Sequence, residues 1–181
     1  MAEPCGKIQE SGVQGAGGMI FVTVGTEKFP FDRLLKIVDS AVADGRIKGP
    51  VFAQIGSCSY KPKYFPYTEY LSFDKMQDNI RKADIVVGHA GVGTMVMCLD
   101  MGKIPIIFPR RASLREHVDD HQFDFTKQME STRRVIAAYD ETGLIDSIRR
   151  YAEIIRAHEL HAGTGFDDRL KGYLREIIYG K

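Results

Sequence analysis

The sequence has no tryptophan, few cysteines and almost no net charge. Its 25 basic residues nearly balance 24 acidic ones, for a formal net charge of +1, so no global field attracts nucleic acid. No apolar run approaches the roughly 20 residues that a membrane-spanning helix requires. Residues 1–18 also lack the apolar stretch of a signal peptide. We therefore expect neither a nucleic-acid partner nor a transmembrane segment.

The three cysteines, Cys5, Cys58 and Cys98, are odd in number and far apart. Their spacing matches neither a metal-binding motif nor a disulfide framework, which favours the reducing cytoplasm. The simplest interpretation of Cys58 and Cys98 is that they pack as small apolar side chains.

The chain has 181 residues, of which 44% are hydrophobic, enough for one domain with a core. Residues 1–18 are rich in glycine and polar side chains and can bury little surface, so we expect a mobile extension or leader there. Residues 19–181 then form a single domain.

Short apolar segments alternate with helical patterns, which is typical of a parallel sheet with helices on both faces. We expect strands at residues 20–24, 51–55, 69–73, 85–87, 104–108 and 134–138. We expect helices at residues 32–43, 74–82, 92–101, 120–130, 142–157 and 166–178. The predicted fold is a Rossmann-like three-layer α/β/α domain with a mainly parallel sheet of about six strands.

The most informative segment is 84–94, where a buried strand ends in a glycine-rich turn and a helix follows. This turn places free main-chain N–H groups at a helix N-terminus on the carboxyl edge of the sheet, which suits a phosphate or diphosphate. Gly91 and Gly93 let the main chain approach the anion, and His89 and Thr94 can add side-chain donors. The alternative for His89 is a core histidine bonded to the main chain.

A second glycine turn, Gly25-Thr26, follows the first strand and should open on the same edge of the sheet. Such a short glycine signal is weak, and Gly25 could equally serve only a tight turn.

The segment 109–122 follows the strand at 104–108, so it should reach this edge as well. Gln122 and an adjacent carboxylate can grip sugar hydroxyls, which need both donors and acceptors. Three arginines can pair with phosphate: Arg110, Arg111 and Arg115.

The alternative for this segment is a solvated, salt-bridged loop in which Asp119 or Asp120 caps the following helix. His117 and His121 lie four residues apart, as metal ligands on a helix can, but this spacing alone is weak evidence. We expect no metal site and no cofactor.

Four segments in combination resemble the nucleotide-sugar half of GT-B glycosyltransferases. They are Phe21 to Thr26, Gly88 to Thr94, Gly102 to Pro105, and Pro109-Arg110 through His121-Gln122. The chain is particularly similar to the stand-alone PssE-type subunits of two-part polysaccharide glycosyltransferases. It also resembles the catalytic subunit of the dolichol-linked UDP-GlcNAc transferase, and MurG carries a related half within a longer chain. The similarity runs from Met19 to about Ala138.

The resemblance implies a UDP-sugar donor and assigns roles to matching positions. The implied diphosphate site comprises Gly25, Thr26, Gly91, Gly93 and Thr94, with His89 stabilising the diphosphate or the leaving group. The implied uracil site is the main chain at Phe73, with Met76 nearby. The implied sugar site comprises Asp120, His121 and Gln122.

The chain departs from the GT-B pattern at Met97. Many of these enzymes have a glutamate at the matching position, where it holds the ribose hydroxyls. Met97 cannot do so, and ribose recognition must come from elsewhere.

The resemblance also implies a partner, because a full GT-B enzyme has two such domains and this chain is long enough for one. A membrane-anchored, PssD-like subunit would bind a polyprenyl-linked glycan acceptor, supply the general base and hold this chain at the inner face of the membrane. The expected reaction is the inverting transfer of a hexose from a UDP-sugar to a polyprenyl-diphosphate-linked acceptor in polysaccharide or glycolipid synthesis.

A non-catalytic nucleotide-sugar-binding or enhancer subunit of a glycosyltransferase complex remains the alternative. A dinucleotide-dependent oxidoreductase is disfavoured, because the glycine spacing at 88–93 is not GxGxxG. The apolar stripe of the expected helix 166–178 could dock a partner or pack on the chain's own sheet.

Overall fold

A computed structural model describes residues 18–159 of the chain. Its centre is a six-stranded sheet in the order β3-β2-β1-β4-β5-β6, in which all neighbouring strands are parallel. The strands are β1 Ile20–Thr23, β2 Val51–Gln54, β3 Tyr67–Thr68, β4 Ile85–Gly88, β5 Ile106–Ile107 and β6 Ile136–Ala137. The predicted Rossmann-like parallel sheet is confirmed.

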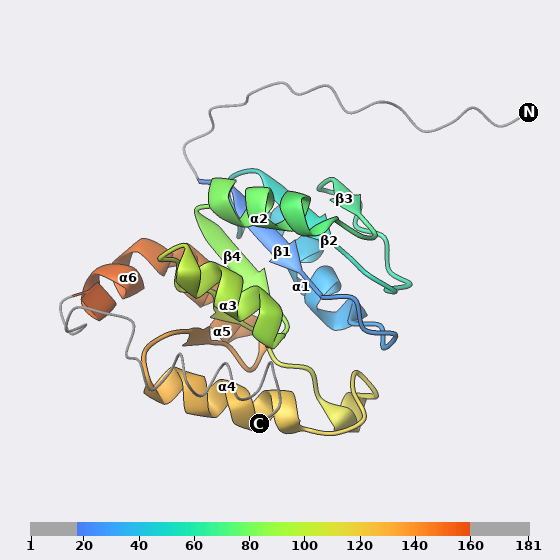
Figure 1. Cartoon of the computed structure of the whole chain (residues 1–181). Helices are drawn as coiled ribbons and strands as arrows, with labels where there is room; N and C mark the ends of the chain where they lie inside the picture. The colour runs from blue at the N-terminus through green and yellow to red at the C-terminus, as the bar shows by residue number, and fades with distance from the viewer. Residues whose placement is uncertain (1–17, 160–181) are drawn as a thin grey trace, which may run out of the picture.

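Helices cover both faces of the sheet, so the domain has three layers (Figure 1). On one face lie α1 (Asp32–Ala43), α5 (Glu141–Arg149) and α6 (Tyr151–Glu159). On the other lie α2 (Phe73–Lys82), α3 (Val92–Asp100) and α4 (His121–Ser131). A short 3-10 helix, Ala112–Leu114, follows β5.

The alternation of side chains along β1 explains the two layers of core. Ile20 and Val22 pack with the α1 face, whereas Phe21 points the other way into a cluster with Ile80 of α2 and Val86 of β4. Because both faces are covered, β1 is apolar at nearly every position, as buried parallel strands are. The two cysteines in the described part, Cys58 and Cys98, are free and buried, in agreement with the predicted packing role.

The expected strand at 69–73 is wrong in position. The strand lies at Tyr67–Thr68, paired with Ala53 and Gln54 of β2. Ser72 then caps α2, because its side chain accepts a hydrogen bond from the Lys75 N–H, and the chain turns into helix at Phe73.

The expected helix at 142–157 is two helices, since α5 ends with Arg150 as its C-cap and α6 begins at Tyr151. The expected helix 166–178 lies outside the described residues, as does the expected extension 1–18 apart from Gly18. No helix in the part of the chain that the structure covers is both long and apolar enough to cross a bilayer.

Candidate functional site

The candidate site lies where the carboxyl ends of β1 and β4 meet. In the sheet register Thr23, the last residue of β1, stands between Gln54 of β2 and Gly88 of β4. From this point the chain leaves β1 toward α1 on one face and leaves β4 toward α3 on the other. Such a switch point opens a crevice at the sheet edge, the usual ligand site of parallel α/β folds.

His89 links the two glycine turns that the sequence indicated. A Cβ added at Gly25 would lie 2.4 Å from the His89 ring, and one added at Gly91 would lie 2.5 Å from it. Only glycine therefore lets both turns close on the imidazole, and Gly25 also has a φ of +77°, which favours glycine. Ala90, which lies between His89 and Gly91, adopts a φ of +67°. This is a strained conformation that the sequence did not reveal.

The imidazole of His89 is uncharged at neutral pH. Its side chain is 5% exposed, and Nδ1 lies 3.4 Å from the Thr23 carbonyl oxygen. Burial, with a smaller effect from the positive charge of Arg110, lowers the pKa of His89 to about 4. A buried neutral ring brings no positive charge to a diphosphate. In the structure the His89 ring packs between the turns at Gly25 and Gly91.

Gln54 fixes the first turn and is a residue that sequence reasoning missed. Its Oε1 accepts hydrogen bonds from Thr23 Oγ1 at 2.7 Å and from the Gly25 N–H at 3.2 Å. Its Nε2 donates to the carbonyls of Gly25 at 2.9 Å and Glu69 at 3.0 Å. The available signal in the sequence was a glutamine at the end of an apolar strand, because a buried amide needs hydrogen-bond partners. In the structure Gln54 is 1% exposed.

The N-terminus of α3 follows β4 at the same edge of the sheet and is uncapped by any side chain. Gly91 is the N-cap residue, and its conformation is extended. Gly93 is exposed, and a Cβ there would meet nothing within 4 Å, whereas Thr94 is buried. The first-turn N–H groups of α3 therefore have room in front of them for an anion.

A cavity of about 490 Å³ separates the start of α3 from α4. Its lining residues are Ala90, Val92, His121, Gln122, Asp124, Phe125 and Gln128. The buried Oε1 of Gln122 has no hydrogen-bond partner in the part of the chain that the structure covers. An acceptor in this position calls for a donor from a ligand or from water.

The structure brings His121 and Gln122 together at this cavity but turns Asp120 elsewhere. Asp120 Oδ1 accepts a hydrogen bond from the Ala112 N–H at 2.9 Å, and the residue is the N-cap of α4 without a side-chain capping bond. Its visible role is to hold the loop between β5 and α4.

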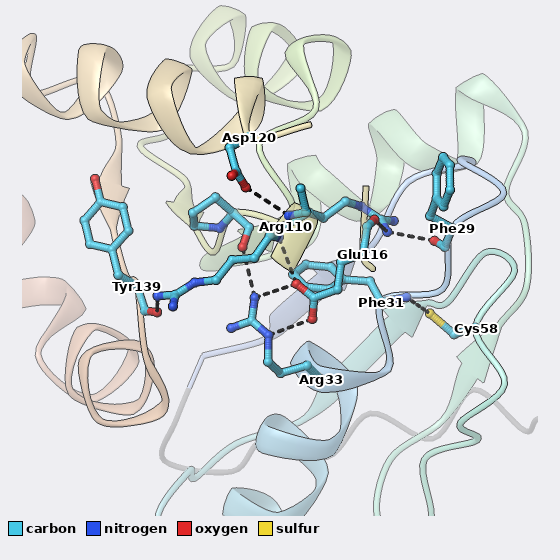
Figure 2. A network of polar contacts seen from close by, with 11 residues as sticks. Phe29, Phe31, Arg33, Cys58, Arg110, Glu116, Asp120 and Tyr139 are labelled. Carbon is cyan, nitrogen blue, oxygen red and sulfur yellow. Dashed lines mark hydrogen bonds and ion pairs between the residues drawn. The ribbon is translucent and has the colours of Figure 1, made fainter. Parts of the chain in front are cut away.

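Arg110 is buried rather than exposed at the edge, and Figure 2 shows its side chain within a network of polar contacts. It is 0% exposed, and its guanidinium stacks over Phe31 at 4.8 Å. Nη1 donates to the carbonyls of Phe29 at 2.7 Å and Glu116 at 3.0 Å, and Nη2 donates to that of Val24 at 2.7 Å. Direct contact with a phosphate, the expectation for Arg110, does not fit this orientation, because these N–H groups are directed to main-chain carbonyls.

Arg33 of α1 completes this network (Figure 2). It forms a two-pronged ion pair with Glu116, at 2.7 and 2.8 Å, and donates to the Pro109 carbonyl. Glu116 also accepts from the Arg111 N–H at 3.0 Å, and the Arg111 side chain donates to the Tyr139 carbonyl. The loops after β1 and β5 are thereby joined into one unit.

The residues implied for uracil recognition lie on α2, next to β3. Phe73 begins the helix and is 65% exposed, whereas Met76 packs partly buried against the cluster around Phe21 and Ile80. Met97 of α3 packs against the same cluster. An exposed aromatic ring at this edge is available to a ligand.

His117 and His121 do not form a metal-binding group with their neighbours. Asp119 lies 3.1 Å from His117 Nδ1 and 3.8 Å from His121 Nε2. The His121 N–H donates to Asp119, and this bond is the largest of the causes that lower the pKa of that carboxyl. Between residues 18 and 159, no cluster of His, Cys, Asp or Glu side chains is arranged to hold a metal ion.

The parallel sheet, the switch point at β1 and β4 and the uncapped start of α3 are the architecture of the nucleotide-sugar half of a GT-B glycosyltransferase, and the family comparison assigns the chain to that class. Residues 19–159 match the Glycosyltransferase family 28 C-terminal domain, and the chain belongs to this family.

Two proteins of known name are similar to the chain in sequence. The human UDP-N-acetylglucosamine transferase subunit ALG13 is 28% identical over 174 residues, covering 87% of this chain and 15% of that protein. The mouse protein of the same name is 28% identical over 121 residues, covering 60% of this chain and 10% of its own length.

Solved structures share the fold. The glycotransferase of kitacinnamycin superposes with a TM-score of 0.54 at 13% identity, over 87% of this chain and 44% of that one. MurG of Acinetobacter baumannii superposes with a TM-score of 0.50 at 16% identity, over 81% of this chain and 44% of that one. The chain thus spans less than half of these enzymes and a small part of its sequence relatives.

Proposed function

We propose that this chain is the donor-binding catalytic subunit of a heteromeric inverting glycosyltransferase that uses a UDP-sugar. The observation that carries the proposal is the open N-terminus of α3 at the switch point, facing a turn that Gln54 and His89 hold in place. A helix N-terminus binds a diphosphate through its N–H groups and its dipole, without a metal. Membership of the glycosyltransferase family supports the same assignment.

Within this proposal each group of residues has a role. Gly91, Gly93 and Thr94 bind the diphosphate at the start of α3, and Gly25 with Thr26 lines its other side. His89 positions both turns. Phe73 and Met76 hold the uracil, and the sugar enters the cavity at His121 and Gln122, where the unpartnered Oε1 of Gln122 accepts from a hydroxyl. Asp120 supports this sugar site by holding the loop before α4.

The chemistry is a displacement at the anomeric carbon. The acceptor hydroxyl oxygen bonds to that carbon while the bond to the UDP oxygen breaks, and the hydroxyl proton passes to a general base. The N–H groups of α3 stabilise the charge that develops on the departing diphosphate. Since His89 is buried and neutral, we assign the base to the partner subunit.

The partner is the second element of the proposal. It is supported by the names of the sequence relatives, which are called transferase subunits. We propose that a membrane-anchored, PssD-like subunit binds a polyprenyl-diphosphate-linked acceptor and recruits this chain to the inner face of the membrane.

A non-catalytic, donor-binding enhancer is the second candidate, and the buried state of His89 favours it, because the turn itself then offers no acid or base. Assays of the reconstituted complex separate the two candidates. A Gln122 variant that transfers slowly even at saturating UDP-sugar supports the catalytic subunit, and a loss of transfer fully explained by weaker binding supports the enhancer.

The first test is calorimetric titration of the chain with UDP, with the UDP derivatives of glucose, galactose, glucuronate and GlcNAc, and with NAD, each with and without magnesium. We expect UDP and one UDP-sugar to bind equally well in both conditions. Gly93→Asp places a carboxylate at the start of α3 and should weaken UDP binding by about tenfold or more. Gly93→Ala is the matched control, because its Cβ meets open space. Wild-type affinity in Gly93→Asp would count against a diphosphate at α3.

A further inference from the structure

Arg110 is a buried cation that lacks a carboxylate partner within residues 18–159. All three of its hydrogen bonds go to main-chain carbonyls, those of Val24, Phe29 and Glu116, and its Nε has no partner there at all. The carboxylate of Glu116 is engaged instead by Arg33 and by the Arg111 N–H. In this loop unit the Arg33 guanidinium pairs with the Glu116 carboxylate, whereas the Arg111 guanidinium, like that of Arg110, donates to a main-chain carbonyl.

Such an arrangement is costly unless something offsets the charge. A buried ion loses its hydration, and carbonyl dipoles return only part of that free energy. Burial is also the main reason why the pKa of Arg110 is lowered, although arginine stays protonated at any physiological pH. Glu116 and Glu27 act on it only at longer range. Unpaired buried charge of this kind is characteristic of sites that await an opposite charge.

The position of Arg110 indicates where that opposite charge would lie. Its Nη2 bonds the carbonyl of Val24, the residue immediately before Gly25. The Gly25 turn in turn contacts the His89 ring, which also contacts Gly91 at the start of α3. The guanidinium is therefore directly behind the crevice, separated from it by one turn of main chain.

We propose that the diphosphate of the nucleotide donor is the missing counter-ion of Arg110, which acts across the Val24–Gly25 turn without touching it. Arg110 is then a positioning residue with an electrostatic role: it supplies positive potential at the crevice while its hydrogen bonds fix the turn. This inference rests on the proposed function, because it presumes a diphosphate at the edge of the sheet.

The test compares ligands that differ only in phosphate, namely uridine, UMP and UDP, by calorimetric titration of the full chain. Arg110→Met removes the charge but keeps a long side chain over Phe31. We expect about a tenfold loss of UDP affinity, a smaller loss for UMP and none for uridine, since only the phosphate charge senses the field. Equal losses for all three ligands would overturn the inference, because they would report a distorted site.

Arg46→Met is the matched control. Arg46 lies at the opposite edge of the sheet, paired with Asp44 and Glu141, and its removal changes the net charge by the same amount. It should leave all three affinities at wild-type values, and a phosphate-dependent loss here would overturn a local role for Arg110.

Glu116→Gln keeps the test decisive if Arg110→Met does not fold. This substitution removes the negative charge that pairs with Arg33 but keeps the shape of the Glu116 side chain. The electrostatic potential at the crevice therefore becomes more positive. We expect tighter binding of UDP and unchanged binding of uridine. Unchanged or weaker UDP binding overturns the inference. If the wild-type chain binds none of the three ligands, both the proposed function and the inference are wrong. If wild type binds UDP but the variants do not behave as expected, only the role of Arg110 is wrong.

Discussion

Gln54 binds both main-chain polar groups of Gly25, accepting from its N–H at 3.2 Å and donating to its carbonyl at 2.9 Å. A single buried side chain thus sets the conformation of the turn after β1. Because the same amide also bonds Thr23 and Glu69, it couples this turn to β1 and to the segment after β3.

Gln54→Glu should therefore destabilise the protein despite its unchanged shape. A carboxylate cannot donate to the carbonyls of Gly25 and Glu69, so the buried Gly25 carbonyl loses this donor, whereas the Glu69 carbonyl keeps its hydrogen bond from the Gly56 N–H. Leaving buried polar groups unpaired costs about 1–3 kcal/mol. Urea unfolding measures the loss, and Gln77→Glu on α2, where the side chain is not fully buried, is the control that should change little. Equal effects in both variants would contradict the role of Gln54.

Gly25→Ala tests the contact between the turn and His89. The new Cβ would lie 2.4 Å from the imidazole, and φ is +77°. Gly45→Ala separates the two causes, because Gly45 has a φ of +73° but open space around its Cβ. We expect about 1 kcal/mol for Gly45→Ala and about 2–4 kcal/mol for Gly25→Ala, from strain and overpacking.

A double mutant isolates the clash itself. Combining Gly25→Ala with His89→Ala removes the ring that the new methyl group meets, so the two changes should cost less together than the sum of their separate effects. Additive destabilisation, measured by urea unfolding, would mean that the ring and the turn are not in contact.

The burial of His89 predicts a pH dependence of stability. Its pKa is about 4 in the folded protein and about 6.5 when unfolded, so the unfolded state binds more protons between these values. The contribution of His89 to the free energy of unfolding should be fully present above pH 6.5. It should fall by about 3 kcal/mol in total as the pH drops toward 4.

His89→Gln removes this contribution and is compared with wild type by urea unfolding from pH 7.5 to pH 4. The free energies of unfolding of the two proteins should run parallel above pH 7 and converge below pH 6.5. Parallel curves throughout would show that His89 is not a buried neutral imidazole.

The sequence predicted most of the sheet because the segments at 20–24, 51–55 and 85–87 are largely apolar and helical patterns separate them. It misplaced β3 because two residues, Tyr67 and Thr68, carry too little pattern to distinguish a strand from its flanks. The helical periodicity at 142–157 continues across Arg150, which hid the break between α5 and α6.

The candidate site was predicted in outline, since glycine turns and helix starts are local features. The roles of Arg110 and Gln54 were not, because each depends on contacts far apart in the chain: Arg110 reaches Val24, 86 positions away, and Gln54 reaches Gly25, 29 positions away. A lone arginine after a strand offers no sign of whether it faces a ligand or a carbonyl. Tertiary packing decides such cases.

Gln122 should distinguish a sugar from a bare nucleotide. Its Oε1 is buried beside the cavity between α3 and α4 and has no hydrogen-bond partner among residues 18–159. A sugar hydroxyl that donates to this oxygen would supply the missing hydrogen bond. Gln122→Ala should lower the affinity for the preferred UDP-sugar by about tenfold and leave UDP binding unchanged, since one hydrogen bond of this kind is worth about 1 kcal/mol or somewhat more. Titration of both ligands measures the difference, and Gln77→Ala, on α2 outside the cavity, should bind both as wild type does. If UDP and UDP-sugar weaken to the same extent in Gln122→Ala, the cavity does not hold the sugar.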